Sequence, residues 1–135
     1  MIWRLIESEA NDAYTNMAID KVLFAQIRQY DGILRIYTWK NPAISIGRHE
    51  RLDDINLGAC RRDGIEVVRR PTGGGTVYHK GDLSFSLIGE WGSNGLPRGV
   101  RESYRFIHTW VIEALKYLGI KSEHYKKIDE QNNPN

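Results

Sequence analysis

Two adjacent arginines followed by a run of glycines form the segment of this sequence that could do chemistry. The segment runs from Arg69 to His79 and reads RRPTGGGTVYH. Backbone N–H groups freed by a glycine turn can cradle an anion, and paired arginines can bind a carboxylate or a phosphate through forked hydrogen bonds. The alternative is a glycine-rich hairpin beside two solvated arginines, and a short glycine motif alone does not separate the two interpretations.

Strand-forming residues flank the glycines on both sides. Residues 66–68 (EVV) precede the arginines, and residues 76–78 (TVY) follow the glycines; both stretches are rich in β-branched and aromatic types. Three glycines cost backbone entropy, so a folded protein tolerates them where φ is positive or where two backbones approach closely. The sequence therefore predicts a shaped turn between two strands rather than a flexible linker.

The spacing of apolar residues predicts the elements that position this turn. In the last of three expected helices, Tyr104, Ile107, Val111, Leu115 and Leu118 recur at helical spacing. We expect helices over residues 16–30, with Thr15 or Asn16 as N-cap, 53–60 and 100–118, and strands over residues 33–39, 43–47, 65–69, 75–79 and 83–88. Helices mixed with successive strands predict an α+β fold.

Composition limits the class of protein. The chain has 135 residues, of which 41% are hydrophobic and 27% charged, which predicts a single folded domain over residues 1–135 with a polar tail from about residue 126 to 135. The net charge of +2 does not favour nucleic acid, and no apolar run is long enough to cross a membrane. The single cysteine, Cys60, suits a reducing, cytoplasmic compartment. The histidines show no metal-ligand spacing, so no bound metal is expected.

The chain resembles the biotin/lipoate protein ligase and acyltransferase family over nearly its whole length. The resemblance begins at residues 3–6 and 16–20, which look like the family's opening strand and first helix, and continues through residues 34–48. It is strongest over residues 69–86, which are similar to the family pattern RR-x-[ST]-GGG-x-V-x-H-x-x-G-[ND]-L-x-x-S. The resemblance implies a mixed β-sheet packed by helices, like the catalytic fold of class II aminoacyl-tRNA synthetases.

The resemblance also implies a set of substrate-binding residues. On the family motif these are Arg69, Arg70, Thr72, Gly73, Gly74, Gly75, Val77 and His79. The family usually places aspartate directly after the histidine, whereas this chain has Lys80. No partner that would orient the His79 ring is therefore predicted.

The family's catalytic groups cannot be placed in this sequence. The lysine of the family, and the nucleophilic cysteine of its acyltransferase branch, belong to a later segment that would lie beyond Asn135. Cys60 lies on a short expected helix beside two arginines, and a small buried hydrophobe is the commoner role of a lone cysteine. The chain thus looks like the amino-terminal part of a family domain, incomplete at its C-terminus. A second chain that completes it, a truncated form and a cleaved form all remain open.

The resemblance implies a role in protein lipoylation, in one of two chemical forms. An acyltransferase moves a lipoyl or octanoyl group from an acyl carrier protein thioester to a lysine of a lipoyl carrier domain, such as an E2 subunit or the glycine-cleavage H protein. A ligase uses ATP, with Mg²⁺, to activate lipoate first. Residues 121–129 lack the Asn-Asp pair of the ligases and favour the transferase, although Gly75 is more typical of ligases. The remaining alternative is a non-catalytic, acyl-binding subunit of a split enzyme.

Overall fold

A computed structural model describes residues 2–92 and 96–124 of the chain. Internal contacts divide the chain into two units, Met1–Glu90 and Trp91–Asn135, and each is described by itself. The single domain over residues 1–135 stays a prediction, and the polar tail over residues 126–135 lies outside the described residues.

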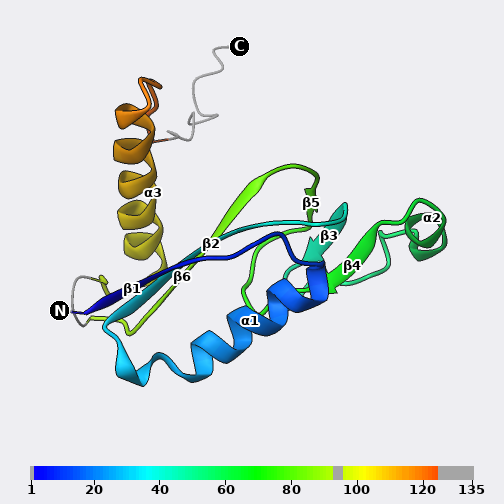
Figure 1. The fold of residues 1–135 in the computed structure, drawn as a ribbon, viewed down its shortest axis with the longest axis horizontal. Helices are drawn as coiled ribbons and strands as arrows, with labels where there is room; N and C mark the ends of the chain where they lie inside the picture. The colour runs from blue at the N-terminus through cyan, green and yellow to red at the C-terminus, as the bar shows by residue number, and fades with distance from the viewer. Residues whose placement is uncertain (1, 93–95, 125–135) are drawn as a thin grey trace, which may run out of the picture. The chain divides into compact units, whose positions relative to one another are not determined.

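Two small mixed sheets form the framework of the first unit (Figure 1). Within the described residues, β1 (Trp3–Glu7), β2 (Gly32–Thr38) and β6 (Leu83–Gly89) form one sheet in the order β1-β2-β6. The other has the order β4-β3-β5, with β3 (Ala43–Ile46), β4 (Glu66–Arg69) and β5 (Val77–His79). Each sheet contains one parallel and one antiparallel pair. The α+β class is confirmed, with the strands divided between two sheets.

The two α-helices of this unit begin at residues other than the predicted ones. The first, α1 (Ala13–Ala25), has Asp12 as its N-cap instead of Thr15 or Asn16, because the Asp12 carboxylate accepts from the N–H of Thr15 at 2.7 Å. The helix ends at Ala25 and a 3-10 turn, η1 (Ile27–Gln29), follows. The short α2 (Leu57–Arg62) starts after Asn56, whose side chain accepts from the N–H of Ala59. The predicted start at residue 53 is therefore wrong.

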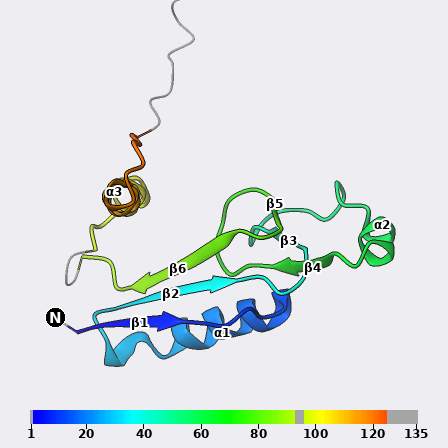
Figure 2. The same ribbon diagram turned by 45° about the horizontal axis from the view of Figure 1, so that its top comes forward.

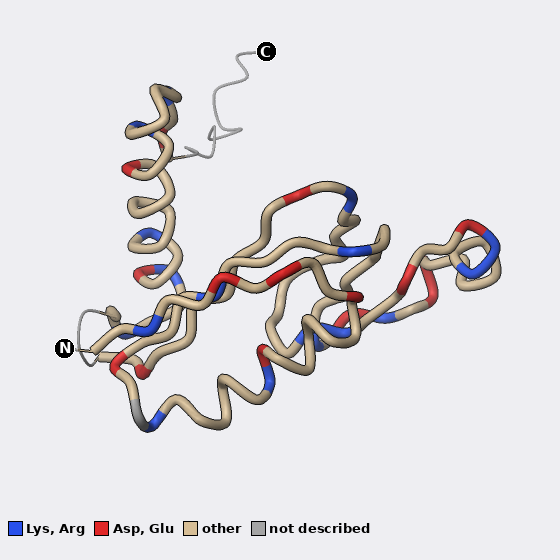
Figure 3. The backbone as a smooth tube through the Cα atoms, in the orientation of Figure 1, with Lys and Arg blue, Asp and Glu red and all other residues tan. Residues whose placement is uncertain are grey.

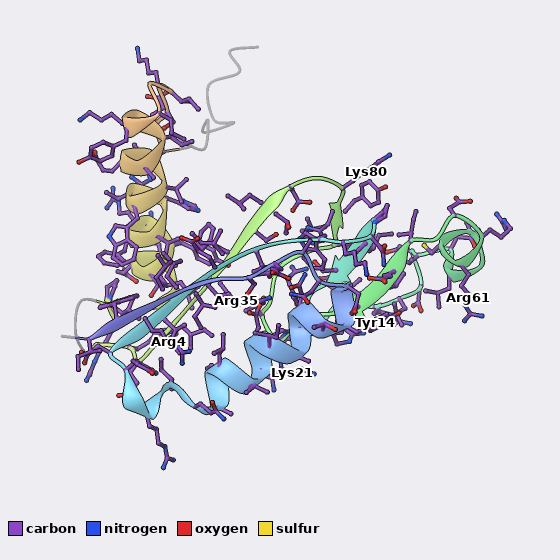
Figure 4. The ribbon with its side chains drawn as sticks, viewed as in Figure 1. Arg4, Tyr14, Lys21, Arg35, Arg61 and Lys80 are labelled. Atoms are coloured by element: carbon purple, nitrogen blue, oxygen red, sulfur yellow. The ribbon has the colours of Figure 1, made fainter. Side chains whose placement is uncertain are left out.

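A buried arginine joins α1 to the sheet β1-β2-β6. Strand alternation directs Arg35 of β2 towards α1, where its side chain is fully buried (Figure 4). Its guanidinium forms an ion pair with Asp20 at 2.8 Å and also donates to the backbone and side-chain oxygens of Asn16 and to Ser8. Because a buried charge must be paired and hydrogen-bonded, these acceptors fix where α1 lies on the sheet.

Aromatic residues from the end of β2 complete the core beside this ion pair. The Arg35 guanidinium lies 4.0 Å from the centre of the Tyr37 ring. Burial, together with the nearby Asp20 carboxylate, raises the pKa of the Tyr37 hydroxyl well above its ordinary value. The buried cluster, packed against Val68, consists of Ala13, Met17, Tyr37, Trp39 and Ala43.

The face of the sheet that does not meet α1 is apolar as well. Figure 2 shows α1 along one side of β1, β2 and β6. On the other face the register aligns Leu5 with Leu34 and Leu87, and the next row contains Phe85. Leu5 is 57% exposed and Phe85 46% exposed. Exposed apolar rows of this kind are typical of interaction surfaces.

The described part of the second unit is dominated by one helix, α3 (Val100–Tyr117). It begins after Gly99, which has a left-handed φ of 102°, and ends close to the predicted boundary at Leu118. Within residues 2–92 and 96–124, no helix has both the length and the apolar character that crossing a membrane would require. Basic and acidic residues are interspersed along the backbone trace (Figure 3).

Removal of the Asp20 carboxylate should destabilise the first unit strongly. In an Asp20→Ala variant the Arg35 guanidinium would stay buried without its ion-pair partner, which costs about 3–5 kcal/mol of unfolding free energy. Urea denaturation followed by circular dichroism measures this change. The matched control is Asp53→Ala, which breaks an exposed pair with Arg51 and should have little effect. Equal losses in the two variants would show that the buried pair does not hold α1 on the sheet.

Candidate functional site

The glycine-rich segment passes over the end of β3. Both β4 and β5 pair with β3, the first in parallel and the second antiparallel, so the segment between them crosses the carboxyl end of the central strand. Backbone hydrogen bonds attach it there, from Arg70 N–H to the carbonyl of Ile46 at 3.0 Å and from Arg48 N–H to the carbonyl of Thr72 at 2.8 Å. The predicted turn between two strands is confirmed. It is a crossing loop and not a hairpin, and residues 70–76 are called the glycine loop below.

Two glycines allow the glycine loop to lie directly on the end of β3. A Cβ atom on Gly47 would fall 1.9 Å from the carbonyl oxygen of Gly74, so only a glycine permits this approach. Gly74 itself has a left-handed φ of 87°, a conformation that costs other residues free energy. By contrast, an added Cβ on Gly73 or Gly75 would meet nothing within 4 Å.

Arg70 holds the glycine loop from inside. Its Nη2 donates to the carbonyl oxygens of Gly73 and Gly75, and its Nε donates to that of Gly73. Its Nη1 donates to both the carbonyl and the hydroxyl of Ser45 on β3. One guanidinium therefore bridges the loop and the central strand, and its charge lies beside the glycines.

The carbonyls of Gly73 and Gly75 accept from Arg70, and the glycine amides have no such partner. Within the part of the chain that the structure describes, the N–H groups of Gly73, Gly74 and Gly75 donate to no protein acceptor. All three residues are exposed. Consecutive free amides beside a cation form an arrangement that suits an anionic oxygen.

Arg69 points the other way, as strand alternation requires. Its Nη1 donates to the carbonyls of Gly47, Arg48 and Glu50, so it fastens the segment that follows β3. A cavity of about 310 Å³ adjoins Arg69, and Ile46, Leu52 and Cys60 are among its lining residues. None of the three glycines lines this cavity. Cys60 is buried, and Arg61 of α2, another lining residue, is labelled in Figure 4.

His79, at the end of β5, is buried and has a partner on each ring nitrogen. Its Nδ1 lies 2.9 Å from Asp82 Oδ2, and its Nε2 lies 2.8 Å from the hydroxyl of Ser45. The Trp39 ring stacks on the imidazole with 3.9 Å between centroids and 15° between planes. Lys80, the residue directly after the histidine, is exposed at the turn and labelled in Figure 4. The carboxylate that orients His79 is thus Asp82, three residues after the histidine, and the sequence analysis did not predict this partner.

The environment of Asp82 favours its charged form. Burial alone would raise the pKa of this carboxyl, but hydrogen bonds from His79, from its own backbone and from Ser84 lower the pKa below the ordinary value of 3.8. Ser84 in turn accepts from the indole N–H of Trp39 at 2.9 Å. Asp82 is therefore held as an acceptor for His79 by the same residues that pack around the ring.

The structure brings most of the predicted binding residues together. Arg70, Thr72 and the three glycines form the loop, and His79 joins it through Ser45. Val77 is 45% exposed on the edge strand β5. Sequence reasoning missed Ser45, Gly47 and Asp82. A serine between Ile44 and Ile46 was the available signal, because a polar side chain in an apolar strand needs a buried partner.

The sequence of this chain is similar to that of a known protein family. The family model for the lipoyl protein ligase A/B catalytic domain matches residues 12–132 of the chain. The chain belongs to this family. Among curated relatives, the octanoyltransferase LipM of Carboxydothermus hydrogenoformans is 37% identical over 124 residues, which cover 90% of this chain and 46% of that protein. The chain therefore spans about half the length of the curated relatives it matches.

Solved structures of the lipoyl protein ligase family have the same fold. A lipoate-protein ligase A bound with ATP aligns with a TM-score of 0.79 and 27% identity, covering 99% of this chain and 53% of that chain. A bi-partite lipoate protein ligase of Thermoplasma acidophilum, analysed with its E2 lipoyl domain, aligns with a TM-score of 0.79 and 26% identity. That match covers 93% of this chain and 49% of that chain. The catalytic fold expected from the resemblance is confirmed.

Alanine substitutions should separate the glycines that shape the loop from the one that does not. Gly47→Ala places a Cβ against the Gly74 carbonyl, and overpacking of this kind costs about 1–3 kcal/mol. Gly74→Ala forces a side chain into a left-handed conformation, at a cost of about 1–2 kcal/mol. Gly73→Ala, the control, meets nothing within 4 Å and should leave thermal stability nearly unchanged. Similar melting temperatures for all three variants would mean that the loop does not rest on Gly47.

The Asp82–His79 pair should contribute stability only while Asp82 is ionised. A carboxyl whose pKa is lowered on folding stabilises the folded state above its unfolded pKa, and this contribution is lost as the pH falls through the folded pKa. We expect Asp82→Asn to destabilise the chain well above pH 3.8, the ordinary value, and the difference from the parent chain to shrink below it. Urea denaturation across this range is the measurement. A difference that is constant with pH would contradict an ionised Asp82.

Proposed function

We propose that this chain is the acyl-binding part of a protein-lipoylating enzyme, and that it binds the carboxyl or thioester end of a lipoyl or octanoyl group at the glycine loop. One observation carries the proposal. Arg70 donates to the carbonyls of Gly73 and Gly75, while the amides of residues 73–75 have no protein acceptor in the described residues. Membership of the lipoyl protein ligase A/B family supplies the substrate class.

The preferred reaction is octanoyl or lipoyl transfer from a carrier-protein thioester. Attack on a thioester places negative charge on the carbonyl oxygen, and preorganised N–H donors stabilise that charge. The amides of residues 73–75 and the neighbouring Arg70 are the groups of this chain that supply such donors and a positive charge. Cys60 is buried and lines the cavity beside Arg69, so we assign it no part in the attack.

An ATP-dependent lipoate ligase is the second candidate. The same amides suit a phosphate oxygen as well as a thioester oxygen. A lipoate-protein ligase A bound with ATP shares the fold of this chain, which favours this alternative. In that case lipoate, ATP and Mg²⁺ would replace the carrier-protein thioester, and the product would be a lipoyl-adenylate.

The proposal includes an acyl acceptor and an acyl donor. The acceptor is a lysine of a lipoyl carrier domain, from an E2 subunit or the glycine-cleavage H protein, and the donor of a transferase is an acyl carrier protein. A second chain that completes the domain belongs to the proposal too, because one structural relative is described as a bi-partite ligase. Cys60, the single cysteine, suits the reducing cytoplasm, where we place the activity.

Octanoate binding to the chain tests the site directly. Titration with octanoate should move the backbone amide NMR signals of Gly73, Gly74 and Gly75, because the carboxylate accepts from their N–H groups. Octylamine, with the same apolar chain and the opposite charge, is the control and should leave these signals in place. If octanoate moves only the signals of residues that line the cavity beside Arg69, the glycine loop is not the site.

Acyl donors separate the two reaction types. Octanoyl carrier protein without ATP, or lipoate with ATP and Mg²⁺, is supplied with a lipoyl domain, and mass spectrometry measures modification of its lysine. The chain by itself should modify nothing. In a second reaction the chain is mixed with the part of a LipM relative that does not align with it. Under the transferase proposal this mixture should use the carrier-protein donor. Use of lipoate and ATP alone would establish the ligase, and modification by the unaccompanied chain would refute the acyl-binding-part proposal.

A further inference from the structure

A continuous chain of hydrogen bonds runs from the β5–β6 turn to the glycine loop. Asp82 Oδ2 lies 2.9 Å from His79 Nδ1, and His79 Nε2 lies 2.8 Å from the Ser45 hydroxyl. That hydroxyl oxygen accepts from Arg70 Nη1 at 3.2 Å, and Arg70 Nη2 donates to Gly73 at 2.9 Å. Three segments that are distant in the sequence are therefore joined by four side chains.

The groups at the two ends of this hydrogen-bond series, with the burial of Ser45, indicate the direction of each hydrogen bond within it. Arg70 can only donate, and an ionised Asp82 can only accept. Ser45 has one hydroxyl proton and is 2% exposed. Its oxygen accepts from Arg70, and the acceptor that the geometry offers to its buried proton is His79 Nε2, which then carries no proton of its own. The ring proton is consequently on Nδ1, where Asp82 accepts it.

Serine, histidine and aspartate in this order also occur in hydrolases, but the burial of Ser45 argues for a different role. A nucleophilic serine must meet its substrate, whereas Ser45 lies on the central strand of its sheet beneath Arg70. Stacking of Trp39 on His79 further limits rotation of the ring. Ser45 and His79 are buried, and a side-chain hydrogen bond from Arg70 to Ser45 connects them to the loop.

We propose that Asp82, His79 and Ser45 are positioning residues that set the Arg70 guanidinium and, through it, the shape of the glycine loop. Asp82 selects the Nδ1–H form of His79, this form accepts a hydrogen bond from the Ser45 hydroxyl, and a lone pair of the Ser45 oxygen holds Arg70 against the carbonyls of Gly73 and Gly75. The role of the loop in acyl binding rests on the proposed function. The hydrogen-bond series itself does not depend on the proposed function, because it forms in the protein without any ligand.

The protonation of His79 in the unmodified chain is the first test. Long-range ¹H–¹⁵N correlation NMR of the histidine-labelled chain distinguishes the two neutral forms and the imidazolium. We expect the neutral Nδ1–H form at neutral pH. A neutral Nε2–H form or an imidazolium would overturn the proposal, because the Ser45 hydroxyl could not then donate a hydrogen bond to the ring. This result requires no variant and no acyl ligand.

Order in the glycine loop is the second test. In the parent chain we expect backbone order parameters of about 0.85 for Gly73 to Gly75, and values below about 0.6 in Asp82→Ala, the range of a flexible backbone. Ser45→Ala should have the same effect, and the matched control Asp53→Ala, at an exposed pair, should have none. A rigid loop in both variants would overturn the proposal, as would equal loosening by the control. Failure of octanoate to bind would leave both tests unchanged, so it would count only against the proposed function.

Discussion

The buried ion pair between Arg35 and Asp20 is the constraint on which the rest of the first unit depends. A guanidinium without solvent exposure requires an acceptor for nearly every N–H group, and here these come from α1 and from Ser8, just after β1. A pair of apolar side chains could occupy the same space with similar stability. It would not specify the rotation and register of α1, as directed hydrogen bonds do.

The position of the glycine loop follows from that constraint through the core. Asn16 of α1, which accepts from Arg35, also donates to the carbonyl of Thr38 and so fixes the end of β2. Trp39 comes next, packs in the core with Ala43 and stacks on His79. Buried groups thus connect the Arg35–Asp20 pair on α1 to the glycine loop, although the pair and the loop have no residue in common. The acyl-binding proposal therefore concerns a loop that is preorganised by the fold rather than by a ligand.

Local sequence features predicted most elements of this fold, whereas long-range polar contacts escaped them. Strand and helix positions followed from apolar spacing and from glycine, and the turn at residues 73–75 followed from residue type. The start of α1 was missed because Asp12, Thr15 and Asn16 are all good caps, and only the structure shows which side chain reaches an N–H. Both arginines were predicted to bind substrate, which stays a prediction; the structure adds that each donates to backbone carbonyls. Such partners are close only in the folded chain, so spacing along the sequence does not reveal them.

The place of the carboxylate beside His79 has a consequence for recognising related proteins. The family usually has an acid next to the histidine, where this chain has the exposed Lys80, whereas Asp82 lies at the Asn or Asp position of the same family pattern and contacts His79. A fixed-spacing pattern would score Lys80 as the loss of a site residue, although the imidazole retains its acid. Divergent sequences are better compared by asking which side chain can reach a given ring nitrogen. By that criterion the turn between β5 and β6 of this chain keeps an acceptor on His79 Nδ1 although a lysine directly follows the histidine.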